Sequence, residues 1–148
     1  MRKHGFTLIE VVILLTVISI LLVSMLVRMP SVNLYKAYNF ANTLLYDLNL
    51  TKILSMSQNQ RYRIVISASS YQIQDQNGVP VVHPETTSSV INYPTGVSVT
   101  PTTTIIFDSL GQPYDATNTA FTTTTTLTVA SSSTNQVISI SPQTGFIQ

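Results

Sequence analysis

The side chain best placed to do chemistry in this chain is Glu10, an acid near the start of an apolar run. The run covers residues 6–27, and it contains no Lys or Arg that could neutralise the carboxylate. An acid at membrane depth is by default a candidate functional site, and its partner must come from a terminus, a neighbouring subunit or lipid headgroups. If the chain were cut between Gly5 and Phe6, the new α-amine of Phe6 would be a cation near that depth. It could then pair with Glu10 of its own chain or of a neighbouring subunit.

The apolar run is long enough to cross a membrane. At about 1.5 Å per residue its 22 residues would span roughly 33 Å, against about 30 Å for the hydrocarbon core of a bilayer. Arg2 and Lys3 precede it without any acid, so the positive-inside rule predicts a cytoplasmic N-terminus and export of everything after Val27. An ordinary secretory signal peptide fits less well, because the run exceeds the usual apolar region and no convincing small-x-small cleavage site follows it.

Residues 2–10 resemble a known processing signal. Their sequence, Arg-Lys-His-Gly-Phe-Thr-Leu-Ile-Glu, is similar to the class III signal of type IV pilins and type II secretion pseudopilins. In that family a membrane prepilin peptidase cuts after the glycine and methylates the new N-terminal phenylalanine, and the glutamate guides docking into a growing filament. The resemblance implies cleavage between Gly5 and Phe6, N-methylation of Phe6, and Glu10 as the assembly residue.

The composition describes an exported domain with few charges. About 120 residues follow the apolar run, enough for one domain with its own core. Charged residues make up only 9% of the chain, and its net charge is +1. Without Arg2 and Lys3, five basic side chains against six acids leave a balance of −1, so no strong field points to an anionic partner. There is no cysteine, which excludes disulfides and thiol chemistry.

Residues 28–60 are expected to continue the membrane segment as an amphipathic helix, giving one rod of about 50 residues. Pro30 should kink the chain or mark its exit from the membrane, and from residue 32 to about residue 59 no Gly or Pro interrupts it. The expected apolar stripe comprises Leu34, Ala37, Tyr38, Ala41, Leu44, Leu45, Leu48 and Met56. The polar residues expected mostly on other faces are Lys36, Asn42, Asp47, Asn49 and Lys52.

Residues 61–148 are expected to form a β-rich globular domain, because short β-branched and aromatic runs alternate with turn residues. The expected strands are 62–66, 71–74, 79–82, 90–93, 97–99, 103–107, 121–129 and 137–141, with a tight turn at Asn77-Gly78 and a turn-rich loop at 108–113. The Thr-rich run 122–126 is expected to be an exposed β-edge. The predicted fold is α+β, with the long N-terminal helix packed on a C-terminal antiparallel β domain.

This half of the chain resembles one subfamily. Residues 107–113, Phe-Asp-Ser-Leu-Gly-Gln-Pro, are similar to the F-x-x-x-G-x-P loop of minor pilins and pseudopilins of the GspH/FimT type. Residues 137–146 are similar to the closing strand and Thr-Gly turn of that subfamily. The resemblance implies a pilin-like fold of four parts: a leader peptide at 1–5, a transmembrane helix at 6–27, an amphipathic helix at 28–60 and a β domain at 61–148.

Nothing in the sequence predicts an enzyme, a metal site or a cofactor. The two histidines, His4 and His83, are not companions, and there is no Gly-rich phosphate loop and no Ser–His–acid arrangement with supporting context. Asp108 and Asp115 flank a turn, where aspartate usually stabilises the backbone.

Two arginines offer a candidate contact with nucleic acid. Arg61 and Arg63 alternate on one face of an expected strand and could meet phosphate, although two cations supply little affinity. In some members of the subfamily, arginines around the last Thr-Gly bind DNA for uptake. Here residues 146–148, Phe-Ile-Gln, follow that turn instead.

The expected function is that of a minor pilin or pseudopilin, a structural subunit of a type IV pilus or type II secretion filament. The resemblance implies other pilins, a prepilin peptidase and an inner-membrane assembly platform as partners. Before assembly the chain would cross the inner membrane once, with its C-terminal domain in the periplasm. The alternatives are a DNA-binding minor pilin for natural transformation, and a major pilin.

Overall fold

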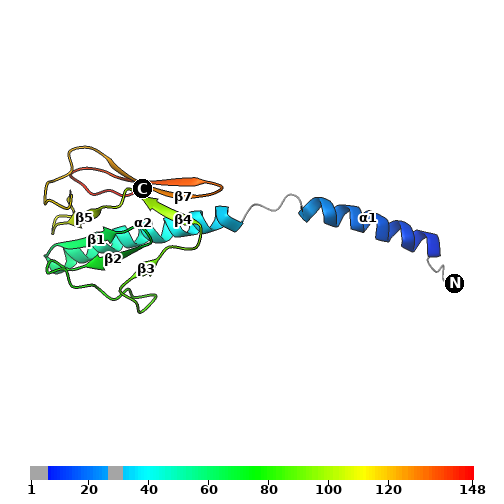
Figure 1. The fold of residues 1–148 in the computed structure, drawn as a ribbon, viewed down its shortest axis with the longest axis horizontal. Helices are drawn as coiled ribbons and strands as arrows, with labels where there is room; N and C mark the ends of the chain where they lie inside the picture. Colours follow the sequence, from blue (N-terminus) through cyan, green and yellow to red (C-terminus); the bar gives the residue numbers. More distant parts are fainter. Residues whose placement is uncertain (1–6, 27–31) are drawn as a thin grey trace, which may run out of the picture. The chain divides into compact units, whose positions relative to one another are not determined.

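The structure is a computed structural model that describes residues 7–26 and 32–148, in two compact units that divide after Ser31 (Figure 1). Within its described residues, 7–26, the first unit holds one helix, α1 (Leu8–Leu26). Its window from Leu8 to Met25 has a mean hydropathy of 2.8, and none of that window is buried in the protein. By length and composition, α1 is able to cross a membrane. The expected leader, the expected kink at Pro30 and the continuity of the expected rod lie outside the described residues.

The second unit consists of one long helix and two antiparallel sheets. The helix is α2 (Val32–Gln58), and Asn59 follows it with a φ of 51°, a left-handed conformation that commonly ends helices. One sheet has the order β3-β2-β1-β5-β6 and the other the order β4-β7-β8. Their strands are β1 (Tyr62–Ile66), β2 (Ser70–Gln74), β3 (Ile91–Asn92), β4 (Val97–Thr100), β5 (Thr104–Phe107), β6 (Pro113–Tyr114), β7 (Thr125–Ser131) and β8 (Asn135–Ile140).

The register of both sheets places apolar side chains on one face. In β1 the residues alternate between buried and half-buried, and Ile64 pairs with Ile73 of β2 and with Ile105 of β5. In the smaller sheet Leu127 of β7 pairs with Ile138 of β8. This alternation is what a strand with one face on the core requires. The helix α2 contacts strands of both sheets, so the core lies between it and them.

The buried face of α2 is rotated from the expected one. Ala37, Ala41, Leu44 and Leu48 are buried as expected, but Leu34, Tyr38 and Met56 are exposed. Asp47, expected on another face, is completely buried. The core-facing stripe continues through Thr51 and Ser55, also fully buried. The prediction was wrong there because apolar residues occur almost all round this helix. The face of α2 that meets the core is therefore not marked by apolar residues alone. It includes polar residues that have hydrogen-bond partners.

Most of the expected strands are confirmed, with two corrections. Residues 79–82 do not form a strand; only Pro80 makes an isolated bridge, with Gln74. Pro80 has no N–H to donate to a ladder, which limits the pairing. In the Thr-rich run, residues 122–124 precede β7, whereas Thr125 and Thr126 begin it and pair with β8 alone. The rest of β7 also pairs with β4, so β7 as a whole is the central strand and not an edge.

Three loops of the second unit share one geometry. They are residues 75–79, 108–112 and 115–119. In each, the first residue is an aspartate whose Oδ1 accepts the backbone N–H groups of the third and fifth residues, at 2.8–2.9 Å. The fourth residue has a positive φ: 82° at Gly78, 80° at Gly111 and 62° at Asn118. The expected tight turn at Asn77-Gly78 and the expected turn-rich loop are two of these three.

The loop at 108–112 is held against α2 and the end of the chain. A Cβ added to Gly145 would lie 2.1 Å from the carbonyl oxygen of Gly111, and one added to Gly111 would lie 2.8 Å from Cε of Lys52. Lys52 donates from Nζ to the carbonyl oxygens of Thr144 and Gly145, at 2.9 and 3.0 Å. Gly145 is therefore needed because its backbone touches that of Gly111, and Gly111 is needed because its φ of 80° disfavours a side chain.

Candidate assembly site

Glu10 lies in the first turn of α1 and forms a capping box with Thr7. The Oε2 atom of Glu10 accepts from the backbone N–H of Thr7 at 3.4 Å and from its hydroxyl at 3.5 Å. In return, the backbone N–H of Glu10 donates to Oγ1 of Thr7 at 3.4 Å. These bonds are long and therefore weak, but they satisfy N–H groups that a helix start leaves unpaired. A negative charge at this end also complements the helix dipole.

The capping box was missed from the sequence, although Thr7-x-x-Glu10 is its usual pattern. No cation for the acid lies within the apolar run. The structure gives the carboxylate a polar partner that is not a cation, so its charge remains unneutralised among residues 7–26. Gly5 and Phe6, the expected sites of cleavage and methylation, lie outside the described residues.

The remainder of α1 presents apolar side chains on all sides, and its hydroxyl groups are hydrogen-bonded to its own backbone. Thr16, Ser19 and Ser24 each donate to a backbone carbonyl three or four residues earlier, at 2.7–2.8 Å. The helix therefore offers lipid or a partner helix a surface whose hydroxyl hydrogens are already bonded. Such a surface meets the requirement that polar groups in a bilayer be satisfied internally.

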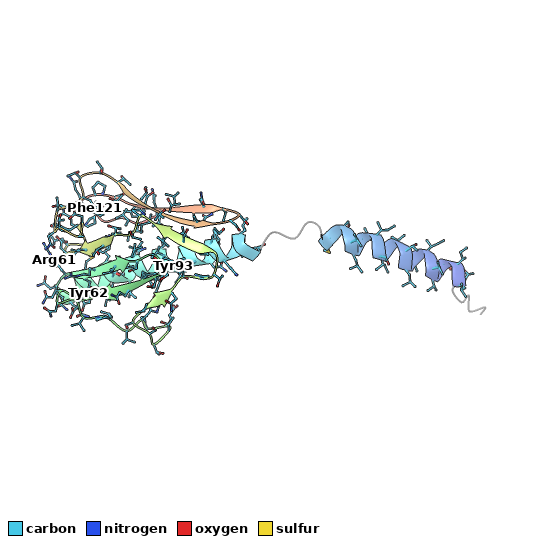
Figure 2. The ribbon with its side chains drawn as sticks, viewed as in Figure 1. Arg61, Tyr62, Tyr93 and Phe121 are labelled. Atoms are coloured by element: carbon cyan, nitrogen blue, oxygen red, sulfur yellow. The ribbon has the colours of Figure 1, made fainter. Side chains whose placement is uncertain are left out.

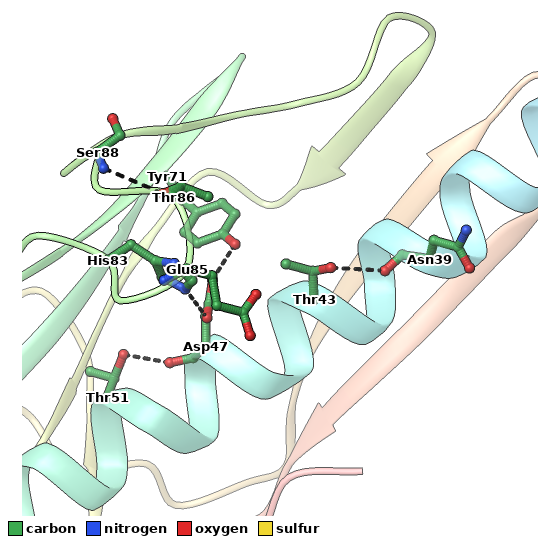
Figure 3. A network of polar contacts seen from close by, with 9 residues as sticks. All are labelled: Asn39, Thr43, Asp47, Thr51, Tyr71, His83, Glu85, Thr86 and Ser88. Atoms are coloured by element: carbon green, nitrogen blue, oxygen red, sulfur yellow. Dashed lines mark hydrogen bonds and ion pairs between the residues drawn. The ribbon is translucent and has the colours of Figure 1, made fainter.

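A second polar cluster, buried in the domain, was not expected. Asp47 of α2 accepts hydrogen bonds from the hydroxyl of Tyr71 and, at 2.7 Å, from Nε2 of His83 (Figure 3). Nδ1 of His83 accepts from the backbone N–H of Glu85, so the neutral imidazole carries its proton on Nε2. All three side chains are almost completely buried. The cluster ties the loop between β2 and β3 to the long helix.

Burial in this region raises the pKa of two tyrosines. The pKa of Tyr71 is raised far above its usual range, first by burial and then by its hydrogen bond to the Asp47 carboxylate. Burial raises the pKa of Tyr93 to about 12. Phe40 packs against both rings, with centroid distances of 6.0 Å to Tyr71 and 5.2 Å to Tyr93. These contacts, together with the hydrogen bond between Asp47 and Tyr71, fix α2 against the larger sheet.

Arg61 lies at the end of the second unit where α2 ends (Figure 2), and Arg63 follows it in β1. Their guanidinium groups reach different loops. Arg61 donates to Oδ1 of Asn118 at 3.0 Å and lies over the ring of Tyr114, 4.8 Å from its centroid. Arg63 donates from Nη2 to the carbonyl oxygen of Gln76 at 2.8 Å. A phosphate would have to compete with these contacts.

Two family models match the chain. One describes the prokaryotic N-terminal methylation motif and covers residues 1–26. The other describes the type II transport protein GspH and covers residues 41–144, more than half of the chain. The chain belongs to the GspH family. No curated protein sequence matches this GspH-family chain.

Two solved structures share the fold of this GspH-family chain. The type IV minor pilin FimU of Pseudomonas aeruginosa has a TM-score of 0.58 at 16% identity, covering 80% of this chain and 91% of that one. The minor pseudopilin EpsH from the type 2 secretion system of Vibrio cholerae has a TM-score of 0.57 at 12% identity, covering 76% and 94%. At such identities the likeness concerns the fold. It confirms the expected α+β, pilin-like architecture.

Proposed function

We propose that this GspH-family chain is a minor pilin or pseudopilin, a structural subunit of a type IV pilus or type II secretion filament. A prepilin peptidase cuts it after Gly5 and methylates Phe6. Before assembly it crosses the inner membrane once, with its N-terminus in the cytoplasm and its β domain in the periplasm. An inner-membrane platform then moves it into a filament with other pilins, through its N-terminal helix.

The observation that carries this proposal is the single carboxylate at the start of α1. Glu10 lies in the first turn of a helix whose apolar side chains from Leu8 to Met25 are all exposed, and the match to the methylation motif covers that same segment. The hydrocarbon core of a bilayer provides apolar contacts for such a helix but no partner for the charge. A neighbouring subunit with a free N-terminal amine would provide both. The arrangement suits a helix that leaves lipid to pack against other helices.

The N-terminus of the mature protein tests this proposal. The full chain is produced in cells with an active prepilin peptidase, and its N-terminal peptide is identified by mass spectrometry. We expect a chain that begins at Phe6 and carries one added methyl group. Cells without the peptidase are the control and should retain Met1. A chain that still begins at Met1 when the peptidase is active would overturn the proposal.

DNA binding for natural transformation is the second candidate, carried by Arg61 and Arg63. These arginines already make contacts within the domain, with Asn118 and Gln76. A salt-dependent shift of DNA by the chain, lost in the double variant Arg61→Ala/Arg63→Ala, would support this function. The absence of binding at low salt would end it.

A major pilin is the remaining alternative, and it differs from a minor one in copy number. The relevant measurement is the abundance of this chain in sheared filaments relative to the other pilins present. A minor subunit should form a small fraction of the filament protein. A chain that makes up most of it would be a major pilin.

A further inference from the structure

One of the three equivalent loops displays a large apolar side chain at its third position, where the geometry does not require one. The third residue is Asn77 in the first loop, Leu110 in the second and Thr117 in the third, and all three are exposed. The loop needs only its aspartate and a fourth residue that tolerates a positive φ. Leucine at this position has no role in the turn, yet Leu110 is 81% exposed. This points to a contact outside the domain.

Other exposed apolar residues gather around the same loop. Phe146, 58% exposed, follows Gly145, whose backbone touches that of Gly111. Met56, 49% exposed, has its sulfur 3.2 Å from where a Cβ on Gly111 would lie, and Ile53, 59% exposed, precedes it by one turn of α2. We call Ile53, Met56, Leu110 and Phe146 the apolar tip patch. It combines three segments that are distant in the sequence.

The backbone beneath the patch is held in place. The N–H of Leu110 donates to Oδ1 of Asp108 at 2.9 Å, and the carbonyl of Phe146 accepts from the N–H of Ser141 at 2.8 Å. Lys52 joins the helix to the C-terminal turn through two hydrogen bonds. Side chains presented on a fixed backbone lose little conformational entropy when they bind, which favours their use as interface anchors.

The charges next to the patch are already engaged within the domain. The ammonium group of Lys52 is bonded to two carbonyl oxygens, and the carboxylate of Asp108 accepts two backbone N–H groups and the hydroxyl of Tyr114. Neither charged group is therefore available to bind a charged ligand. The surface therefore fits an apolar, uncharged protein surface better than an anionic lipid or a nucleic acid.

The patch lies at the C-terminal end of α2, whereas the membrane segment precedes the N-terminal end of α2 in the chain. The 27 residues of α2 span about 40 Å, and the membrane segment joins at the Val32 end. Subunits that insert into a filament through parallel stems are related by a screw operation, so their contacts are between unlike surfaces. We propose that the apolar tip patch docks onto the globular domain of a neighbouring pilin-class subunit, through a different surface of that subunit. This inference rests on the proposed function.

Site-specific cross-linking in cells tests the docking. A photo-cross-linking phenylalanine analogue is placed at position 110 of the full chain, and at 77 and 117 as matched controls in the equivalent loops. We expect position 110 to give an adduct that contains a pilin-class chain, and positions 77 and 117 to give none. The proposal is overturned if position 110 gives no adduct, an adduct with lipid, or one that joins position 110 of two copies.

A fourth position, 20 on α1, separates the two proposals. If position 20 cross-links to pilin-class chains and position 110 does not, the docking is wrong and the proposed function stands. If neither position cross-links to such chains, both are wrong.

A substitution gives an independent readout of the same contact. Leu110→Asn places the residue of the first loop in the second, so the turn should be preserved and the thermal unfolding midpoint unchanged. Incorporation into filaments should fall about tenfold or more, as for a central interface residue. Val82→Asn, which changes another exposed apolar residue, is the control and should incorporate normally. Normal incorporation of Leu110→Asn would contradict the docking.

Discussion

Glu10 combines two roles, since its carboxylate both caps α1 and carries the charge proposed to meet the amine of Phe6. Glutamine at this helix position supports a capping box but carries no charge, and Thr7→Ala removes the cap and keeps the charge. We expect Glu10→Gln and Glu10→Ala to be processed normally and to be poorly incorporated into filaments, and Thr7→Ala to be incorporated. Mass spectrometry of the N-terminus and the fraction of chain in sheared filaments measure the two steps. Normal incorporation of Glu10→Gln would show that the charge has no part in assembly.

Asp47 is the residue whose loss should most damage the domain. In Asp47→Ala the hydroxyl of Tyr71 and Nε2 of His83 would both be buried without a partner. Each unsatisfied group costs about 1–3 kcal/mol, so the free energy of unfolding should fall by about 3 kcal/mol or more. Denaturant unfolding of the detergent-solubilised chain measures it. Glu85→Ala removes an exposed acid in the same region and should change stability by less than about 0.5 kcal/mol.

At the scale of elements, the contact between two loop backbones can be tested with alanine. Gly145→Ala would place a Cβ 2.1 Å from the carbonyl of Gly111, whereas Gly96→Ala would meet nothing within 4 Å. Both glycines have a positive φ, which costs alanine about 1–2 kcal/mol. Gly96→Ala should therefore show only that cost, and Gly145→Ala should lose about 4 kcal/mol or more. Similar unfolding free energies for the two variants would mean that the loops do not need their close contact.

The existence of the helices and of most strands could be predicted from the sequence, but the packing of the long helix could not. Alternation in Tyr62–Ile66 identifies a strand with one buried face whatever lies around it. In α2 apolar residues occur on nearly every face, so periodicity did not determine which face meets the sheets. Asp47 is buried because Tyr71 and His83, from elsewhere in the chain, supply its hydrogen bonds. Such partners are not visible in a local pattern.

Glu10 and its cap could be predicted from the sequence, whereas the apolar tip patch could not. Glu10 stood out because a single acid in an apolar run has a simple energetic consequence. Its cap by Thr7 is also indicated by the sequence, as the four-residue pattern Thr7-x-x-Glu10. The apolar tip patch could not be found, because it needs the contact between Gly111 and Gly145.

For the whole molecule, we expect stability to fall in alkaline solution. In the unfolded chain Tyr71 ionises near pH 10, whereas in the folded domain its pKa is raised by burial and by Asp47. Above pH 10 the unfolded state thus binds fewer protons than the folded state. The free energy of unfolding should then decrease with rising pH, by up to about 1.4 kcal/mol per pH unit for this group. Tyr93, which is more exposed, should contribute less.

Unfolding midpoints from about pH 9 to about pH 11 measure this dependence. Tyr71→Phe should be less stable at neutral pH, because Asp47 loses a donor, but its stability should depend less on pH in the alkaline range. Tyr35→Phe changes an exposed tyrosine and should keep the full dependence. An unchanged slope in Tyr71→Phe would assign the alkaline loss to other groups.

The three equivalent loops make this domain a convenient scaffold for labelling. Each loop is closed by its own aspartate, so its shape is set by five residues and not by the surrounding protein. Gln76, Asn77 and Ala116 are exposed, and the turn uses their backbones but not their side chains, whereas the hydroxyl of Thr117 is bonded to Asp115. A fluorophore attached at 76, 77 or 116 would thus report on the subunit in living cells without disturbing its core.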